Sequence, residues 1–251
     1  KTGGTVSDGR LVEKTFENML TEANDIAVEL GIESGLNFIS TTTAEHLFGF
    51  TFHYMLPYVT GNITQPERIH YPENINFDNA VLVTTPSFLE AMRKYDSHPV
   101  KNPKIIISAG AKLETPTFEF AQTIADEVIE IYGSTESGVI AYRKNPNENL
   151  KLFRGIKILE TGNDYTKLET NYSKKSPVII EDRIKLFGDE IEFLGRSERV
   201  LKIQEKRIAA DIMEAEIKKS DYIDSAYCFE YETKLAAFGI LSDKGKEFLL
   251  Q

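Results

Sequence analysis

The amino-acid sequence predicts an α/β protein: a mostly parallel sheet with flanking helices, a β-rich subdomain and a small α+β C-terminal domain. Three observations lead to this prediction. Up to about residue 138, continuous apolar strands alternate with helical patterns, which is typical of a parallel sheet covered on both faces. Short β-segments with polar turns follow. After residue 196 a charged stretch precedes one more helix and a hairpin.

The first part of the chain supplies helices and buried strands in alternation. Residues 14–30 carry apolar side chains three and four positions apart, which predicts a helix with one apolar stripe. Further helices are expected at 86–95, where Pro86 suits a first helical position, and at 117–127. The expected strands are 36–40, 80–84, 104–108 and 128–131.

The second part of the chain is expected to form shorter β-segments and then a small domain. The segments are 139–142, 150–159, 167–169, 178–187 and 191–194. We place a large domain at 1–196 and the start of a small hinged domain at 197–251. Within the small domain we expect a helix at 208–219, a hairpin of 225–232 with 234–241, and a helix from 245.

Composition excludes several classes of protein. The chain of 251 residues is 41% hydrophobic and 27% charged, which is normal for a folded globular protein. A net charge of −10 without a sustained basic patch argues against nucleic acid as a partner. Cys228 is the only cysteine, so no internal disulfide and a reducing, cytoplasmic setting are expected. No apolar run approaches the ~18 residues that a membrane span needs, and no signal peptide is visible.

Residues 131–138 (Ile-Tyr-Gly-Ser-Thr-Glu-Ser-Gly) form the most informative segment. An apolar strand leads into hydroxyl groups, two glycines and one carboxylate. Hydroxyls and backbone N–H groups donate to phosphate oxygens, and a carboxylate is a hard ligand for Mg²⁺. An ordinary polar turn after a strand is an equally good interpretation of these residues taken alone.

Two other segments suit the same chemistry. Residues 2–10 place hydroxyls and glycines before Arg10, a pattern that can form an anion-binding nest, although a flexible terminus is the commoner case. Asp182 could accept hydrogen bonds from two ribose hydroxyls, and Arg196 could donate to the same nucleotide. Surface salt bridges are the usual role of such charges.

Together, these segments resemble the signature of the adenylate-forming superfamily: acyl-CoA and aryl-CoA synthetases, nonribosomal peptide adenylation domains and luciferases. Residues 132–136 match its Tyr-Gly-x-Thr-Glu segment in full, and residues 2–10 are similar to its Thr-Ser-Gly-Thr-Thr-Gly-x-Pro-Lys loop. The other matching segments, in chain order, are 46–49 (His-x-x-Gly), 108–111 (Gly-Gly-Ala), 180–182 (Thr-Gly-Asp), 195–199 (Gly-Arg-x-Asp-Asp) and 204–208 with Glu214 (Arg-Gly-x-Arg-Ile and a distal Glu).

The chain also departs from this signature. Arg10 stands where the loop has lysine, Gly9 where it has proline, and Glu181 where a glycine precedes the ribose acid. The family's long N-terminal stretch and its terminal Pro-x-x-x-x-Gly-Lys segment do not occur in these 251 residues, and the chain begins with Lys1 rather than Met. We therefore expect a divergent branch and a fragment that is nearly inactive by itself.

The resemblance implies ATP-dependent activation of a small-molecule carboxylic acid and transfer of the acyl group to a thiol, on CoA or on the phosphopantetheine of an acyl carrier protein. It implies that Glu136 binds Mg²⁺ and that Thr135 contacts the α-phosphate. The implied ATP or AMP contacts are Thr2, Thr5, Ser7 and Arg10 (triphosphate), Gly110, Ala111 and Tyr132 (adenine), and Asp182 and Arg196 (ribose). The implied acyl pocket includes His46, Phe50 and Gly133, and the implied hinge is Glu198.

Two alternatives from other classes remain. A non-catalytic nucleotide- or acyl-binding protein could keep the phosphate-binding segments without turnover. An unrelated α/β hydrolase is disfavoured, because the sequence contains no Gly-x-Ser-x-Gly nucleophile elbow.

Overall fold

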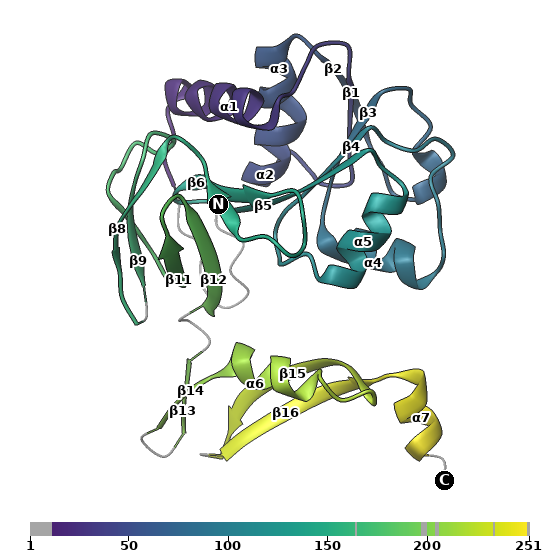
Figure 1. Ribbon diagram of the computed structural model, residues 1–251, viewed down its shortest axis with the longest axis vertical. Helices are drawn as coiled ribbons and strands as arrows, with labels where there is room; N and C mark the ends of the chain where they lie inside the picture. Colours follow the sequence, from purple (N-terminus) through teal and green to yellow (C-terminus); the bar gives the residue numbers. More distant parts are fainter. Residues whose placement is uncertain (1–11, 164, 197–199, 204–205, 233, 250–251) are drawn as a thin grey trace. The chain divides into compact units, whose positions relative to one another are not determined.

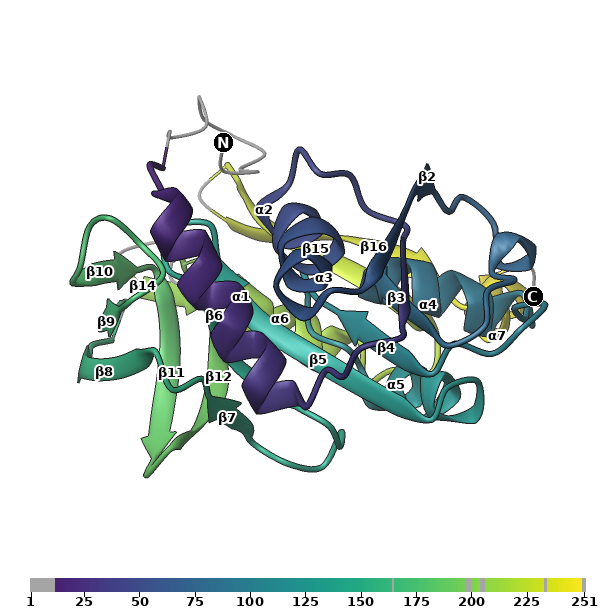
Figure 2. The ribbon, with the colours of Figure 1, turned by 90° about the horizontal axis from the view of Figure 1, so that it is seen from above.

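The computed structural model describes residues 12–163, 165–196, 200–203, 206–232 and 234–249 (Figures 1 and 2). These residues form two compact units. Of the described residues, the first comprises 12–159, 167–180 and 186–192, and the second comprises 160–163, 165–166, 181–185 and those from 193 to 249. The domain boundary expected after residue 196 stays a prediction.

A large sheet with a parallel centre organises the first unit. Its strand order is β11-β12-β7-β6-β5-β4-β3-β1-β2. Neighbours among β1 (Asn37–Ser40), β3 (Ala80–Thr84), β4 (Ile105–Ser108) and β5 (Glu127–Ser134) pair in parallel, as does β2 (Ile63–Arg68) with β1. The expected fold class, a mostly parallel sheet with helices and a smaller β-containing part, is confirmed.

The other strands of this sheet pair in the opposite sense. β6 (Gly138–Arg143) runs antiparallel to both β5 and β7 (Leu150–Leu152), and β7 runs antiparallel to β12 (Glu190–Arg196). β11 (Asp182–Phe187) lies at the edge beyond β12. The polarity of the sheet therefore changes at the β5–β6 hairpin, whose turn holds Thr135 and Glu136.

Helices cover both faces of the parallel strands, as Figure 1 shows for α1 to α3 on one side and α4 and α5 on the other. α1 (Phe16–Leu30) begins with a capping box at Thr15, because Thr15 and Asn18 satisfy each other's backbone N–H groups. α4 (Pro86–Lys94) and α5 (Thr115–Thr123) pack together over an apolar core. The core side chains from the strands include Ile39, Leu82, Ile106 and Val128.

The segment between β1 and β2 is helical throughout but irregular. α2 (Leu47–Phe50) continues into a π-helix, η1 (Thr51–Met55), and then into α3 (Leu56–Thr60). A short 3-10 helix, Pro72–Asn74, follows β2. β2 was not predicted, because it carries Pro66 and mostly polar residues, which suit the edge of a sheet rather than its centre.

Two expected boundaries near the site are wrong. The helix expected at 117–127 is α5, which ends at Thr123, because Glu127 already pairs with Ile105 in the sheet. The strand expected at 128–131 extends to Ser134, because β6 continues the ladder on its other side. Tyr132 and Gly133 consequently lie on a strand, and the turn is confined to residues 135–137.

A smaller three-stranded sheet is formed by β8 (Ile156–Thr161), β9 (Thr166–Thr170) and β10 (Val178–Ile180), in the order β10-β9-β8. The expected strand at 150–159 is divided into β7 and β8, with residues 153–155 between them. The expected strand at 178–187 is likewise divided into β10 and β11.

The C-terminal part of the second unit contains two hairpins and two helices. β13 (Val200–Ile203) pairs with β14 (Lys206–Ala209), and β15 (Ile223–Tyr231) pairs with β16 (Lys234–Leu241). α6 (Ala210–Ile217) starts two residues later than expected, because residues 208 and 209 belong to β14; α7 (Asp243–Leu249) closes the described chain. Among the described residues, no helix combines the length and apolar character that crossing a bilayer requires.

Candidate functional site

The carboxyl ends of the parallel strands form an edge rich in hydroxyl groups. Because β1, β3, β4 and β5 run in parallel as neighbours, their last residues lie at the same end of the sheet. Ser40, Thr84 and Ser108 end the first three of these strands and are fully buried. Ser134 ends β5 and is half-buried. This edge is where open parallel sheets bind ligands.

The buried hydroxyls of this edge differ in what they contact. Thr84 Oγ1 lies 2.8 Å from Thr41 Oγ1, and Ser40 Oγ accepts a hydrogen bond from the Thr42 N–H. Ser108 Oγ has no hydrogen-bond partner within the described part of the chain, although it is buried. A buried polar atom without a partner is uncommon and points to a group that is supplied by a ligand or by water.

Gly110 and Ala111, the expected adenine contacts, are exposed in the loop that follows Ser108. A buried ion pair fixes the end of this loop. Glu130 Oε1 accepts the Leu113 N–H at 2.8 Å, and Arg143 Nε donates to Glu130 Oε2 at 2.6 Å. The loop is therefore tied to β5, the strand that carries Tyr132.

Thr135 and Glu136 lie half-buried in the turn between β5 and β6. Among the described residues, neither side chain makes a hydrogen bond or ion pair. Ser134 Oγ accepts the Ser137 N–H at 3.1 Å and lies 2.9 Å from Ser137 Oγ, which braces the turn across its base. The turn thus holds one hydroxyl and one carboxylate that its own hydrogen bonds leave available.

The glycines that flank this turn are required by close packing. A Cβ on Gly133 would lie 2.6 Å from the carbonyl oxygen of Gly138. Gly138 has a φ of +82°, and a Cβ there would collide with the carboxylate of Glu22. Both positions therefore exclude side chains. Whether Gly133 also lines an acyl pocket stays a prediction.

Glu22 reaches the turn from α1. Its Oε1 accepts the Val139 N–H at 2.8 Å, and its Oε2 lies 3.2 Å from Lys14 Nζ. Burial raises the pKa of Glu22, while Lys14 and the Val139 N–H oppose the rise because both favour the carboxylate. Glu22 was not among the predicted site residues. A charged residue beside Ala23 and Ile26 on the buried side of an amphipathic helix is the signal that could have found it.

Glu130 was also missed. It interrupts the apolar run of β5, and only a partner makes a carboxylate tolerable there. That partner is Arg143, which lies directly opposite Glu130 in the β5–β6 register. A lone acid inside an otherwise apolar strand, followed by an arginine after the hairpin, is the corresponding signal in the sequence.

The described carboxylates of this edge do not by themselves form a metal site. No group of three or more His, Cys, Asp or Glu residues within the described chain could hold a metal ion. Magnesium in nucleotide sites usually takes one or two carboxylates and completes its shell with phosphate oxygens and water. Glu136 supplies one carboxylate at this edge, and whether it holds magnesium stays a prediction.

His46 and Phe50, the expected acyl-pocket residues, lie at the two ends of α2, which follows β1 at the same edge. His46 is exposed at the N-terminus of the helix, and Phe50 is half-buried with its ring 6.4 Å from that of Tyr54. In the π-helix that follows, burial lowers the pKa of His53, which favours a neutral ring. The segment therefore offers aromatic surface, from Phe50 and Tyr54 among others.

The remaining predicted residues lie elsewhere. Asp182 begins β11 in the second unit and is buried, and its carbonyl oxygen accepts a hydrogen bond from Thr166 Oγ1 at 2.7 Å. Arg196 ends β12, and its side chain is not among the described groups. Thr2, Thr5, Ser7, Arg10 and Glu198 lie outside the described residues.

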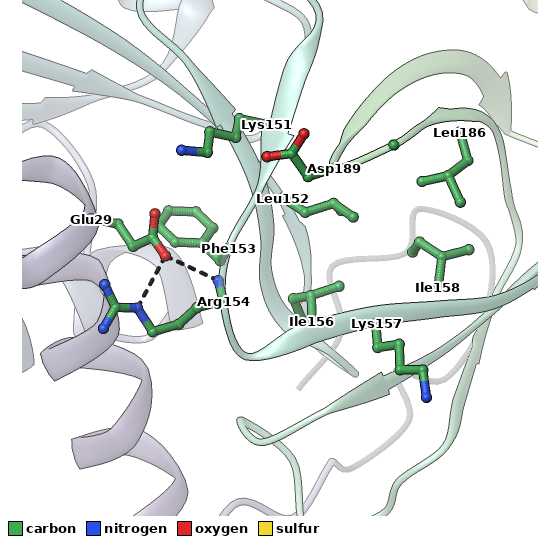
Figure 3. A pocket seen from close by; sticks show the side chains of 11 residues that line it. Glu29, Lys151, Leu152, Phe153, Arg154, Ile156, Lys157, Ile158, Leu186 and Asp189 are labelled. Carbon is green, nitrogen blue, oxygen red and sulfur yellow. Dashed lines mark hydrogen bonds and ion pairs between the residues drawn. The ribbon is translucent and has the colours of Figure 1, made fainter.

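A pocket of about 420 Å³ lies elsewhere in the first unit, between the end of α1 and residues 151–158 with 186–189 (Figure 3). Glu29 Oε1 accepts hydrogen bonds from the backbone N–H and the Nε of Arg154 at its wall. None of the predicted site residues is among the described residues that line it.

No protein-family description matches the sequence, and no curated protein matches it either. Solved structures do match the fold. MatB from Rhodopseudomonas palustris bound to ATP has a TM-score of 0.78 at 14% identity, over 97% of this chain and 57% of that one. O-succinylbenzoate Coenzyme A synthetase from Bacillus subtilis with AMP has a TM-score of 0.77 at 16% identity, over 96% and 58%.

The anthranilate CoA ligase AuaEII in complex with anthranoyl-AMP gives a TM-score of 0.74 at 14% identity, over 92% of this chain and 55% of that chain. The chain therefore spans little more than half the length of these proteins. At sequence identities this low, the similarity shows a shared fold only. The fold of this chain is that of the adenylate-forming enzymes whose motifs its sequence resembles.

Proposed function

We propose that this chain is the ATP-handling part of an enzyme that activates a carboxylic acid and passes the acyl group to a thiol. The carboxylate oxygen attacks the α-phosphorus of ATP, the bond to the bridging oxygen of pyrophosphate breaks, and acyl-AMP forms. The thiol sulfur then attacks the acyl carbon, and AMP leaves. One observation supports the proposal: Thr135 and Glu136 stand in a braced turn after β5, the strand that pairs with β4 where β4 ends at Ser108.

Each residue of this edge takes a role that its position supports. Tyr132 lies on β5, next to the end of β4, so Tyr132, Gly110 and Ala111 can enclose a flat heterocycle. The hydroxyl of Thr135 can donate to the α-phosphate. Glu136 would hold Mg²⁺, which when bound neutralises phosphate charge; such positioned charges supply most of the catalysis in reactions at phosphorus.

The proposal extends to residues that the structure does not place beside this edge. Asp182 and Arg196 would bind the ribose, and Thr2, Thr5, Ser7 and Arg10 the triphosphate. Glu198 would be the hinge for the small domain between the two half-reactions. These assignments rest on the motif resemblance alone.

The substrate is proposed as a class. The solved neighbours include an O-succinylbenzoate Coenzyme A synthetase and an anthranilate CoA ligase. CoA is therefore the first thiol to test, and the phosphopantetheine of an acyl carrier protein is the second. His46, Phe50 and Gly133 would border the acid, and the aromatic surface of α2 favours an acid with an apolar body.

Isothermal calorimetry of ATP with this chain, in excess magnesium chloride and again in EDTA, tests the proposal. We expect tighter binding with magnesium in the wild type. Ser108→Ala provides a second test, because Ser108 Oγ has an unused hydrogen bond; we expect weaker nucleotide binding, by about two- to tenfold, with an unchanged melting temperature. Failure of the wild-type chain to bind ATP or AMP at millimolar concentration would contradict the proposal.

A further inference from the structure

The turn that carries Thr135 and Glu136 is held at its far end by a helix that is distant in sequence. Val139, the second residue of β6 after the turn, donates its N–H to Glu22 Oε1 at 2.8 Å, in a buried hydrogen bond across 117 positions of the chain. The fit is close, because the same carboxylate occupies the space that a side chain on Gly138 would need. Glu22 therefore fixes the backbone of residues 138 and 139, directly after the turn.

The carboxylate of Glu22 is itself fixed from its other side. Lys14 Nζ lies 3.2 Å from Glu22 Oε2 and also donates to the carbonyl oxygen of Tyr172 at 2.8 Å. The side chains of Lys14 and Glu22 are only 7% and 1% exposed. In so dry a setting the pair has little freedom to rearrange, because any movement would leave a buried charge without a partner.

A second tether acts on the residue before Gly138. Thr170 Oγ1 donates to the Ser137 carbonyl oxygen at 2.9 Å, and the Tyr172 N–H donates to Thr170 Oγ1 at 3.0 Å. The backbone is thus fixed at Ser137 and at Val139. All of these contacts lie within the first unit.

We propose that Glu22 is a positioning residue that holds the turn so that the Glu136 carboxylate stays where a divalent cation bound to ATP can use it. The inference rests on the function proposed above. Loss of the acceptor would leave the Val139 N–H buried and unpaired, and the chain would move to solvate it. Glu22 acts on Glu136 through the backbone between residues 136 and 139, so its loss is expected to weaken magnesium binding by misplacing the turn.

Two double variants separate this role from general stability. Lys14→Met with Glu22→Gln keeps an acceptor for Val139, whereas Lys14→Met with Glu22→Leu removes it. Both remove the two charges together, so neither leaves a lone buried ion. ATP affinity is measured by calorimetry with excess magnesium chloride and with EDTA, and exchange of the Val139 amide is measured by NMR.

With the Leu variant we expect the gain in ATP affinity from magnesium to fall by about tenfold or more, because the unpaired Val139 N–H displaces the turn, and we expect the Val139 amide to exchange faster. With the Gln variant we expect the gain in ATP affinity from magnesium to stay within about threefold of the wild-type gain. The ATP affinity in EDTA should be similar in all three proteins. If the Leu variant does not fold, Lys14→Met with Glu22→Met, whose flexible side chain fills similar space, replaces it.

The proposal is overturned if the Val139 amide exchanges faster in the Leu variant while the magnesium-dependent gain stays equal to that of the Gln variant. In that case the contact is structural only. A wild-type chain that binds ATP with no effect of magnesium, or does not bind it, would overturn the proposed function itself and this inference with it.

Discussion

Arg143 and Glu130 face each other across the β5–β6 hairpin, with Arg143 Nε 2.6 Å from Glu130 Oε2 and both side chains largely buried. Arg143 also donates to the carbonyl oxygen of Leu113 at 3.3 Å, while Glu130 accepts the Leu113 N–H. One ion pair therefore joins the hairpin to the loop that carries Gly110 and Ala111. Two segments that resemble the family's motifs, 132–136 and 108–111, are thus linked by an ion pair between residues that lie outside both motifs.

Arg143→Met is expected to lower the free energy of unfolding by about 3–5 kcal/mol, because it leaves the Glu130 carboxylate buried without its partner. The neighbouring Lys144 supplies a matched control. Its ion pair with Glu127 is partly exposed, at 38% and 32%, so Lys144→Met should change the same quantity by less than about 1 kcal/mol. Urea unfolding of the two variants measures the difference. Equal losses in the free energy of unfolding would show that the Glu130–Arg143 pair stabilises the fold no more than the exposed pair does.

Gly138→Ala tests the close fit between the hairpin and α1. The variant should lose about 1–3 kcal/mol more stability than Gly35→Ala, because its methyl group would collide with the Glu22 carboxylate. Gly35 has a similar φ, +87° against +82°, and open space around it, so its variant reports the cost of the backbone conformation alone. If thermal unfolding gave the two variants the same melting temperature, the packing of Glu22 against Gly138 would be contradicted.

The lowered pKa of Glu90 leads us to expect that the free energy of unfolding falls in acid. A hydrogen bond from Arg93 is the largest cause that holds the pKa of Glu90 below its usual 4.5, and partial burial opposes it. Because the folded-state pKa is lowered, the stabilisation is present above pH 4.5 and is lost as the pH falls through the folded pKa.

Comparison of wild type with Glu90→Gln across pH checks this prediction. At pH 7 the wild type should be the more stable by up to about 1 kcal/mol, since the pair is partly exposed and screened. Below both pKa values the difference should vanish. Glu119→Gln, at an exposed site on α5, is the control variant. A difference between wild type and Glu90→Gln that grew toward acid would reverse the sign and contradict the assignment.

Glu136→Gln is expected to remove most of the gain in ATP affinity that magnesium provides while sparing the fold. The amide keeps the size of the side chain and loses the charge that a hard cation needs. Calorimetry with magnesium and with EDTA measures the gain, and Glu148→Gln, an exposed residue after β6, is the control. A variant that kept the full gain would remove Glu136 from the metal site.

Much of the fold could be predicted because its signals are local. The apolar runs of β3 and β4 and the three- and four-residue spacing of α1 lie within single elements, and all three form at or within one or two residues of the expected positions. β2 could not be predicted, because its mostly polar residues become a strand only through the backbone of β1 beside them.

The candidate site divides in the same way. The segment 132–136 is identifiable from the sequence, because its glycines, hydroxyl groups and carboxylate are adjacent. Glu22 and Arg143 are not, because their roles depend on contacts with Val139 and Leu113 that form only in the folded chain. A charged residue inside an apolar pattern can be recognised in the sequence, but the residues that it contacts cannot.

The exchange of labelled pyrophosphate into ATP, with the gene product that contains this chain and a panel of fatty, aryl and amino acids, tests the central claim most directly. We predict exchange that depends on one class of acid, needs magnesium, and falls by at least about a hundredfold in Glu136→Gln. ATP binding without pyrophosphate exchange for any acid would contradict the proposed enzymatic activity and favour a nucleotide-binding protein of the same fold.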